Sequence, residues 1–486
     1  MKESKYKIGI CLIILSLVLV TLSTSYYGST DTGDYADAAR YFAGDYSAKI
    51  RSSHSYLLGF IHAPFVNLFD SLIAFKISSL IFLLLIIYSV YSITGKNKKI
   101  LWLALLSPIL WYMAPWASPI QIASLCMLWA YHFINKYDKT EKLSLLAYSG
   151  ILIGLAWAFW DTVWIFGGIL GLVFLFNKKL SHSIFFSAFV GVGLLPRLIL
   201  DYYLFNFPVY SIIKNILGTF TNQLGGVSGL SSGHMTTSFG SILLVLIAVP
   251  FLFWKFYSKK LFKEHKKTMI FLTLSLLVIF ANPQIRYVLI LAPIMLILLS
   301  KIELTNKEFK RAMAISAIIL MLFAIPHVLQ IKYSLSDAPE GTDFSDFVTN
   351  PSLIRIEPFI VGKQIESDLN DIVLDYPDKT FLVGNSNDAY QTLAHFYWGS
   401  DVKEFVSIQD YNLFLENKTN LFEKTFMPLP NINERRQIWI AGGMSRSTND
   451  KTDYSNIDYA IGFGEPINAE GFELVKNYGN LYLSKR

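Results

Sequence analysis

Residues 100–135 read ILWLALLSPILWYMAPWASPIQIASLCMLWAYHFIN and contain no charged side chain over 36 positions. A helix that crosses a bilayer needs roughly 20 apolar residues, so this run is long enough for two such helices. Its centre holds Pro115 and Pro119, and proline favours a turn between helices. The stretch therefore predicts a hairpin of two membrane-spanning helices.

Charge-free runs continue on both sides of this hairpin, at residues 8–30, 77–95, 143–160, 162–177, 180–196, 239–254, 268–285, 287–300 and 312–331. Each is close to the length of one span, so the fold class expected is a polytopic α-helical membrane protein with about 11 transmembrane helices. The first run lacks a small-residue cleavage site and is expected to remain as a helix. Charged residues make up 16% of the chain, against about 25% in soluble domains, which argues against a wholly soluble enzyme.

The charges divide the chain into two parts. Residues 1–331 hold 28 Lys and Arg against 13 Asp and Glu, or +15, whereas residues 332–486 hold 14 against 23, or −9. The cations of the first part gather in alternate loops, which predicts a cytoplasmic N-terminus. An odd number of spans then places residues 332–486 outside. Alternating strand and helix patterns there predict an extracytoplasmic α/β domain with a mostly parallel sheet and an antiparallel edge. The helices are expected at residues 357–374, 387–398 and 410–415, and the strands at 380–384, 404–408, 437–441, 457–463, 472–477 and 480–483.

Seven of the 13 acidic residues in the first part fall on the expected outer side, and these are Asp31, Asp34, Asp37, Asp45, Asp70, Asp161 and Asp201. Carboxylates at a membrane boundary are costly unless they face a polar cavity. Their collection on one side of the membrane therefore predicts a site there.

The first outer loop, residues 30–70, is the most acidic segment of this side. A helix over residues 35–43, capped by Thr32 or Asp34, would place Asp34 and Asp37 on one face. Its apolar face, which includes Tyr35, would lie in the membrane interface. The alternative is a surface amphipathic helix whose aspartates only complement the helix N-terminus.

Three stretches of this part resemble the GT-C membrane glycosyltransferases, above all the protein-mannosyltransferase and aminoarabinose-transferase-like branches. The first is the acidic loop with Gly33-Asp34-Tyr35, followed by His62-Ala63-Pro64, which would open the second helix. The others are Pro196-Arg197 with Asp201-Tyr202-Tyr203, and Asn282-Pro283 with Arg286-Tyr287. Their order along residues 1–331 carries the resemblance. Two departures, Tyr35 in place of Glu and Asn206 in place of Gly, leave the branch open.

The resemblance implies a glycosyltransferase that moves a hexose- or mannose-type sugar from a dolichyl or undecaprenyl phosphate to a lipid-linked glycan or protein on the outer membrane face, with inversion. It implies Asp34 as the catalytic base, with Asp37 as second choice, because a base must deprotonate the acceptor hydroxyl. Arg286, and next Arg197, would bind the donor phosphate, since a guanidinium grips phosphate oxygens in pairs. Both arginines also fit simple snorkelling to the interface.

Weaker candidates for substrate contacts are His54, His62, Asp161, Asp201 and His234. A structural role is the alternative for each histidine, and His234 lies in a Gly/Ser-rich segment that equally fits a linker. No tightly bound metal is expected, although Asp34 with Asp37 or Asp161 leaves room for Mg²⁺ or Mn²⁺. Two cysteines provide neither a disulfide framework nor a Cys-based metal site.

The expected partners are the lipid bilayer, the lipid-linked donor and the acceptor, without nucleic acid. One competing function is a transporter or flippase of lipid-linked glycans, which would place charges at mid-membrane on broken helices. Another is a non-catalytic membrane protein whose outer domain binds partners.

Overall fold

The computed structural model describes residues 3–24, 31–44, 55–66, 68, 71–213, 215–216, 263–281, 285–302 and 304–329 of the first part. In the second part it describes residues 332–334, 355–357, 381–383, 405–407, 458–463, 466–467, 471–479 and 481–486, with short helical pieces between 367 and 379.

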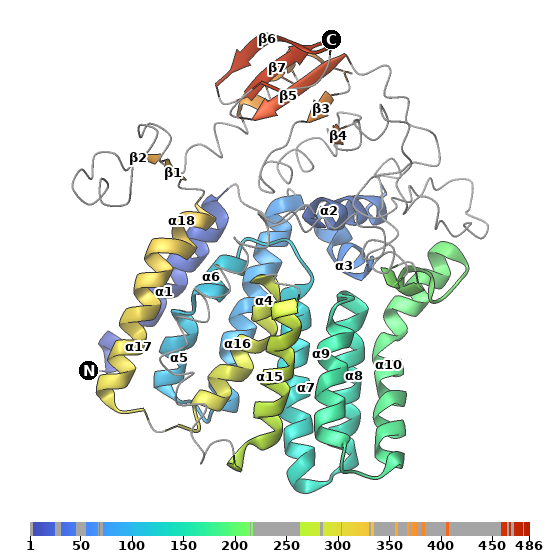
Figure 1. The fold of residues 1–486 in the computed structure, drawn as a ribbon, viewed down its shortest axis with the longest axis vertical. Coiled ribbons are helices and arrows are strands. Elements are labelled where there is room, and N and C mark those ends of the chain that lie inside the picture. Colours follow the sequence, from blue (N-terminus) through green and yellow to red (C-terminus); the bar gives the residue numbers. More distant parts are fainter. Residues whose placement is uncertain are drawn as a thin grey trace.

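A bundle of antiparallel helices forms the larger part of the molecule (Figure 1). Its helices are α1 (Glu3–Ser23), α4 (Ser71–Ile93), α5 (Lys98–Leu105), α6 (Pro108–Met113), α7 (Ile120–Thr140), α8 (Leu143–Phe159), α9 (Val163–Leu175), α10 (Leu180–Phe205), α15 (Lys266–Ala281), α16 (Ile285–Leu299), α17 (Asn306–Ile319), the π-helix η1 (Leu320–Ala324) and α18 (Ile325–Val328). These elements overlap the predicted charge-free runs, most closely at α8 and α9. The run 239–254 lies outside the described residues, so the predicted number of 11 spans stays a prediction.

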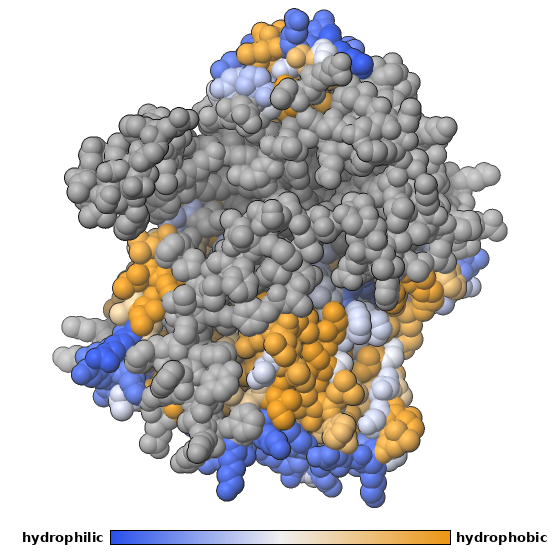
Figure 2. Space-filling model, viewed as in Figure 1, coloured by the Kyte–Doolittle hydropathy of each residue, from blue (hydrophilic) through white to orange (hydrophobic). Residues whose placement is uncertain are grey.

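The described helices have membrane character. Three of them, α1, α4 and α10, contain segments long and apolar enough to cross a bilayer, and four shorter helices are apolar. Leu172 and Ile199 expose 70% and 65% of their surfaces on the outside of the bundle, where lipid would replace water. Figure 2 shows this apolar flank, which ends below at a hydrophilic rim.

The predicted hairpin is formed by α5 and α6 on one side and α7 on the other. Its turn is fastened by Gln121, whose side-chain amide donates to Ser79 Oγ at 2.9 Å and to the carbonyls of Met113 at 3.0 Å and Trp116 at 2.9 Å. Buried polar groups are stable only when such bonds are made. Gln121 therefore fixes where α7 begins.

Helices α8 and α10 pack with their backbones in contact. A Cβ added to Gly154 would lie 2.0 Å from the carbonyl oxygen of Val190, and one added to Gly193 would lie 2.0 Å from that of Ile151. Small residues allow this approach between helices in a membrane. The contact sets the spacing between α10, which carries Arg197 and Asp201, and α8, which ends two residues before Asp161.

Helix α10 is longer than the sequence suggested. The charge-free run 180–196 predicted a span ending at Pro196, but the helix continues through this proline to Phe205. Proline removes one backbone hydrogen bond from a helix. In membrane proteins this is tolerated, because neighbouring helices and local adjustments satisfy the freed carbonyl. As a result Arg197 and Asp201, four residues apart, lie on one helical face.

The C-terminal part forms a five-stranded sheet in the order β4 (Phe405–Ser407), β3 (Phe381–Val383), β5 (Tyr459–Phe463), β7 (Leu481–Lys485), β6 (Glu473–Tyr478). Pairs β4–β3 and β3–β5 are parallel, whereas β5–β7 and β7–β6 are antiparallel. Gly479 turns the chain between β6 and β7 with φ +61°, a backbone conformation that favours glycine. A separate pair, β1 (Lys332–Ser334) with β2 (Arg355–Glu357), is antiparallel.

The predicted first residue of one helix in this part is wrong. The helix expected over residues 357–374 cannot begin at Glu357, which ends β2, and the described helical residues lie between 367 and 375. The predicted helices 387–398 and 410–415 and the strand 437–441 lie outside the described residues.

The bundle has two different ends (Figure 1). At the end nearer the sheet, called the strand end here, lie two further helices, α2 (Asp31–Phe42) and α3 (Leu57–Val66). Tyr35 of α2, Leu194 of α10 and Leu483 of β7 belong to one buried apolar cluster. At the opposite end, called the lysine-rich end, lie the α7–α8 and α9–α10 connections and the start of α15.

Candidate active site

Helix α2 carries the acidic motif of the first loop. It begins at Asp31, four residues before the predicted start, so Thr32 and Asp34 lie inside the helix and do not precede it as caps. The side chains of Asp31, Asp34 and Asp37 lie outside the described part of the structure. The helix itself places Asp34 and Asp37 at the strand end, three residues apart.

The apolar face of α2 is buried in protein and does not lie in the membrane interface as predicted. Tyr35 exposes 5% of its surface, and Ala39 exposes none. A Cβ on Gly59 of α3 would lie 2.5 Å from the Cβ of Ala38, so glycine is what permits this close approach. Helix α2 is thus a packed element, fixed by α3.

His62 and Pro64 lie within α3, and the spanning helix α4 opens only at Ser71. The prediction that His62-Ala63-Pro64 opens the second span is therefore wrong. His62 is buried, with Nδ1 2.8 Å from the carbonyl oxygen of Leu58 and its ring stacked on Phe75 at 4.1 Å. These contacts hold α3 against α4.

Below α2 and α3, the structure brings together three predicted site residues, Asp161, Arg197 and Asp201. Arg197 Nη1 donates to Asp161 Oδ1 at 2.5 Å, and its Nε donates to Ser211 Oγ at 2.9 Å. The Ser211 hydroxyl in turn donates to Asp201 Oδ2 at 2.6 Å, and the backbone N–H of Ser211 donates to the same oxygen at 2.8 Å. Ser211 thereby links the arginine to the second carboxylate.

This four-residue group, Asp161–Arg197–Ser211–Asp201, is called the buried cluster below. Arg197 exposes 1% of its surface and Asp201 none. With both carboxylates ionised the cluster carries one net negative charge. Within the described residues, Arg197 Nη2 and Asp201 Oδ1 make no hydrogen bond. The cluster therefore has one negative charge that is not neutralised, together with one donor and one acceptor that are not hydrogen-bonded.

The end of the first loop reaches the buried cluster. The Ser55 hydroxyl donates to the carbonyl of Ala158 at the end of α8, three residues before Asp161. Burial, and then the neighbouring carboxylate of Asp201, raise the pKa of Tyr56 well above its ordinary value. The loop that carries the acidic helix is therefore bonded to the end of α8, three residues before Asp161 of the cluster.

Arg286, the first choice for donor phosphate, lies half-buried in the first turn of α16 at the same end. The next residue, Tyr287, packs against Trp160 with ring centroids 5.5 Å apart, and Trp160 directly precedes Asp161. The late Arg-Tyr segment is thus placed beside the turn between α8 and α9.

One buried cation of this end was missed. Lys76 of α4 exposes 2% of its surface, and its amine donates to the carbonyl of Thr24 at the end of α1. The signal in the sequence was a lysine at the edge of the charge-free run 77–95. Ser211 was also missed, because a serine in a short connection has no pattern that marks it.

Two candidates, His54 and His234, lie outside the described residues. Among the residues that the structure describes, no group of three His, Cys, Asp or Glu side chains is arranged to hold a metal ion. Asp161, one of the predicted partners for Mg²⁺ or Mn²⁺, is instead paired with Arg197. The prediction of no tightly bound metal, with Mg²⁺ or Mn²⁺ left open, therefore stays a prediction.

Comparison with known proteins relates this fold to solved structures. No protein-family model and no curated protein matches the sequence. Two crystal structures of ArnT from Cupriavidus metallidurans, one in the apo state and one bound to undecaprenyl phosphate, each match with a TM-score of 0.54. Identity is 11% and 10%, and the matches cover 100% and 99% of this chain and 98% of each ArnT chain. At this identity the likeness shows a fold shared with ArnT, while the GT-C family and its branch stay predictions from the sequence.

Proposed function

We propose that this chain is an integral-membrane glycosyltransferase that uses a polyprenyl-phosphate sugar as donor. The observation that carries the proposal is the likeness in fold, over nearly the whole of both chains, to ArnT, one of whose structures holds undecaprenyl phosphate. The convergence of the first loop, the buried cluster and the Arg286 segment at one end of the bundle supports a reaction site there. The cation distribution favours the outer membrane face for that end.

In the proposed reaction the acceptor hydroxyl attacks the anomeric carbon of the sugar. A new C–O bond forms, the bond from that carbon to the phosphate oxygen breaks, and the polyprenyl phosphate leaves. We assign Asp34 as the base that accepts the hydroxyl proton, with Asp37 as the alternative on the same helix. The transition state has oxocarbenium character, which a nearby carboxylate stabilises.

The two arginines receive different roles in this proposal. Arg286 is half-buried, so its guanidinium is suited to reach a phosphate at the membrane interface. Arg197 is almost fully buried and already bound by Asp161 and Ser211. Arg197 is therefore assigned as a positioning residue that fixes α10 against the turn between α8 and α9.

The sugar proposed is of the hexose or mannose type, and the acceptor is a lipid-linked glycan or a protein. The test is transfer of radiolabel by the purified protein from polyprenyl-phosphate hexoses to such acceptors. Asp34→Asn is expected to lower the rate by a factor of about 10² to 10⁴, the usual contribution of a general base. Asp31→Asn is the matched control, because it removes the same charge from the same helix and should retain the rate.

Normal transfer by Asp34→Asn would refute the base assignment and shift it to Asp37. Arg286→Ala should raise KM for the lipid donor more than Arg286→Lys does, since lysine keeps the charge and loses only the paired geometry. If the wild-type protein moves labelled lipid between bilayer leaflets but transfers no sugar, the chain is a flippase and the proposal fails.

A further inference from the structure

At the lysine-rich end, a cavity of about 240 Å³ lies between the ends of α4, α7 and α16 and the start of α15. Its polar lining consists of Lys136, Lys139, Lys301, His132, His265 and Asn135. Among the described residues, no carboxylate lines it. We call it the basic cavity.

The basic cavity is built by one face of α7. His132, Asn135, Lys136 and Lys139 follow spacings of three and four residues, which bring side chains to the same side of a helix. Asp138 lies on the neighbouring face and is engaged elsewhere. It accepts from Lys267 at 2.5 Å and lies 3.9 Å from Lys178.

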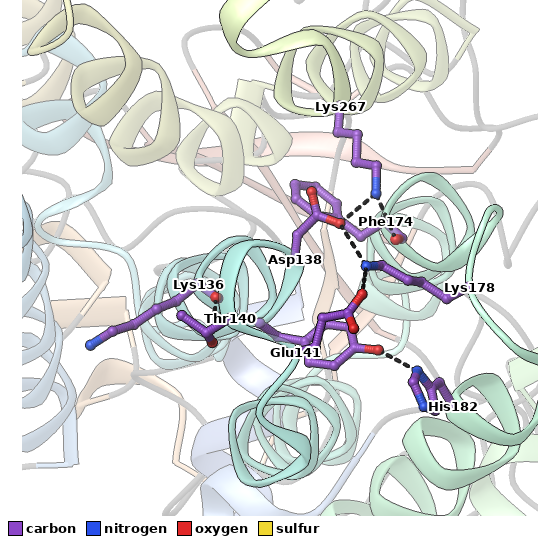
Figure 3. A network of polar contacts seen from close by, with 9 residues as sticks. Lys136, Asp138, Thr140, Glu141, Phe174, Lys178, His182 and Lys267 are labelled. Atoms are coloured by element: carbon purple, nitrogen blue, oxygen red, sulfur yellow. Dashed lines mark hydrogen bonds and ion pairs between the residues drawn. The ribbon is translucent and has the colours of Figure 1, made fainter.

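Figure 3 shows the contrast between the two faces. Lys178 bridges Asp138 and Glu141, with 2.5 Å between Lys178 Nζ and Glu141 Oε1, whereas Lys136 extends away from this network. Within the described part of the chain, Lys136, Lys139 and Lys301 form no ion pair. Asp138 and Glu141 thus pair with Lys178 and Lys267, and neither pairs with the three lysines around the cavity.

The lysines of the cavity act on the pKa of His265. Burial, and then the charges of Lys139 and Lys301, lower the pKa of this histidine, while the carboxylate of Glu264 acts in the opposite direction and is outweighed. An anion that entered the cavity would meet three ammonium groups with no competing carboxylate on the lining.

We propose that the basic cavity binds the phosphate head group of an anionic membrane lipid. Lysine binds phosphate as a point charge, and basic pockets between membrane helices on the cytoplasmic side are suited to lipid head groups. The rest of the wall is formed by Tyr131 and by the apolar residues Ile93, Ile297 and Leu298. This apolar part matches the glycerol and first acyl carbons of a phospholipid better than a free phosphate. The site is separate from the strand end and does not depend on the proposed glycosyl transfer.

The test measures the binding of phosphatidylglycerol to the detergent-purified full chain by native mass spectrometry, with phosphatidylcholine, which is zwitterionic and has no net charge, as the comparison. The double variant Lys139→Gln/Lys301→Gln is expected to bind phosphatidylglycerol roughly thirtyfold more weakly, the effect of two lysines near a lipid phosphate. Lys307→Gln/Lys310→Gln is the matched control, because both residues are exposed lysines of α17 at the same end. It should bind phosphatidylglycerol like the wild type.

Equal weakening in both double variants would overturn the proposal, because it would show attraction to the whole lysine-rich surface and no specific cavity. Equal retention of phosphatidylcholine and phosphatidylglycerol would do the same. Inorganic phosphate that binds the wild type as tightly as the lipid would assign the cavity to a free phosphate and refute the lipid head group. Lys136→Gln provides a second, single-charge variant, and an unchanged thermal unfolding midpoint shows that each variant is folded.

Discussion

The two ends of the bundle use the same kind of contact in opposite surroundings. Asp161 and Arg197 at the strand end, and Asp138 and Lys267 at the lysine-rich end, each form an ion pair of 2.5 Å. The Arg197 side chain is 1% exposed, whereas those of Asp138 and Lys267 are 25% and 27% exposed. The Asp161 side chain is 12% exposed, so the first pair is less accessible to water than the second and is screened less. The distance between the charged atoms therefore does not give the contribution of an ion pair to stability. Burial decides how much free energy of unfolding is lost when one partner is removed.

The sharpest way to test this contrast is to remove one cation from each end. Arg197→Met leaves two buried carboxylates without their partner, and we expect a loss of about 3–5 kcal/mol in the free energy of unfolding. Lys267→Met removes a cation from a hydrated pair and should cost about 1 kcal/mol or less. Denaturant unfolding in detergent, followed by circular dichroism, measures both.

Similar losses for the two variants would show that exposure does not separate the two pairs. The double variant Arg197→Met/Asp161→Asn adds a further check. It removes one stranded charge together with the arginine, so it should recover part of the stability lost by Arg197→Met alone.

A smaller effect on stability is expected at the backbone contact between α8 and α10. Gly154→Ala places a Cβ 2.0 Å from the Val190 carbonyl oxygen, so α8 and α10 must separate at a cost of about 1–3 kcal/mol. Gly191→Ala on α10 is the matched control, because an added Cβ there meets no atom within 4 Å. Thermal unfolding of the two variants compares them, and equal midpoints would contradict the close contact.

The smallest effect is expected at the lysine-rich end and depends on pH. The hydrogen bond from Lys178, and then its charge, lower the pKa of Glu141. A carboxyl whose folded pKa is lowered stabilises the fold above its ordinary pKa of about 4.3, and loses that contribution as pH falls through the folded value. At pH 7, Glu141→Gln should therefore unfold at a slightly lower temperature than the wild type.

The difference between Glu141→Gln and the wild type should vanish as the carboxyl becomes protonated in acid. Unfolding midpoints at pH 7 and below pH 4 measure it. A difference that stays constant with pH would assign the effect of Gln to packing and not to charge.

Much of the fold was predictable because it follows from local pattern. The runs 143–160 and 162–177 correspond to α8 and α9 within two residues at each end, since a long apolar stretch without charge has few alternatives to a helix in lipid. The strands near residues 381, 405 and 459 were also predicted from short apolar runs. Pattern failed where tertiary packing overrides it, as at Pro196 inside α10 and at the early start of α2.

The sequence predicted which charged residues belong to the site, but not which of them pair with one another. Arg197, Asp161 and Asp201 were selected because charges are rare in the bundle. Their pairing joins residues 36 positions apart along the chain, and the link through Ser211 depends on how the segment after α10 folds back. No sequence spacing encodes such contacts. Lys76 shows the same limit, because its bond to Thr24 appears only when α1 and α4 pack together.

The backbone contact between α8 and α10 also bears on how the molecule responds to the thickness of its bilayer. Helix α8 has 17 residues and α10 has 26, or about 26 Å and 39 Å at 1.5 Å per residue. One is shorter and the other longer than a hydrocarbon layer of roughly 30 Å. Alone, a short helix would thin the bilayer and a long one would tilt. Because their backbones touch at Gly154 and Gly193, we expect the two helices to tilt together, with the distance between Asp161 and Arg197 unchanged in thin and thick membranes.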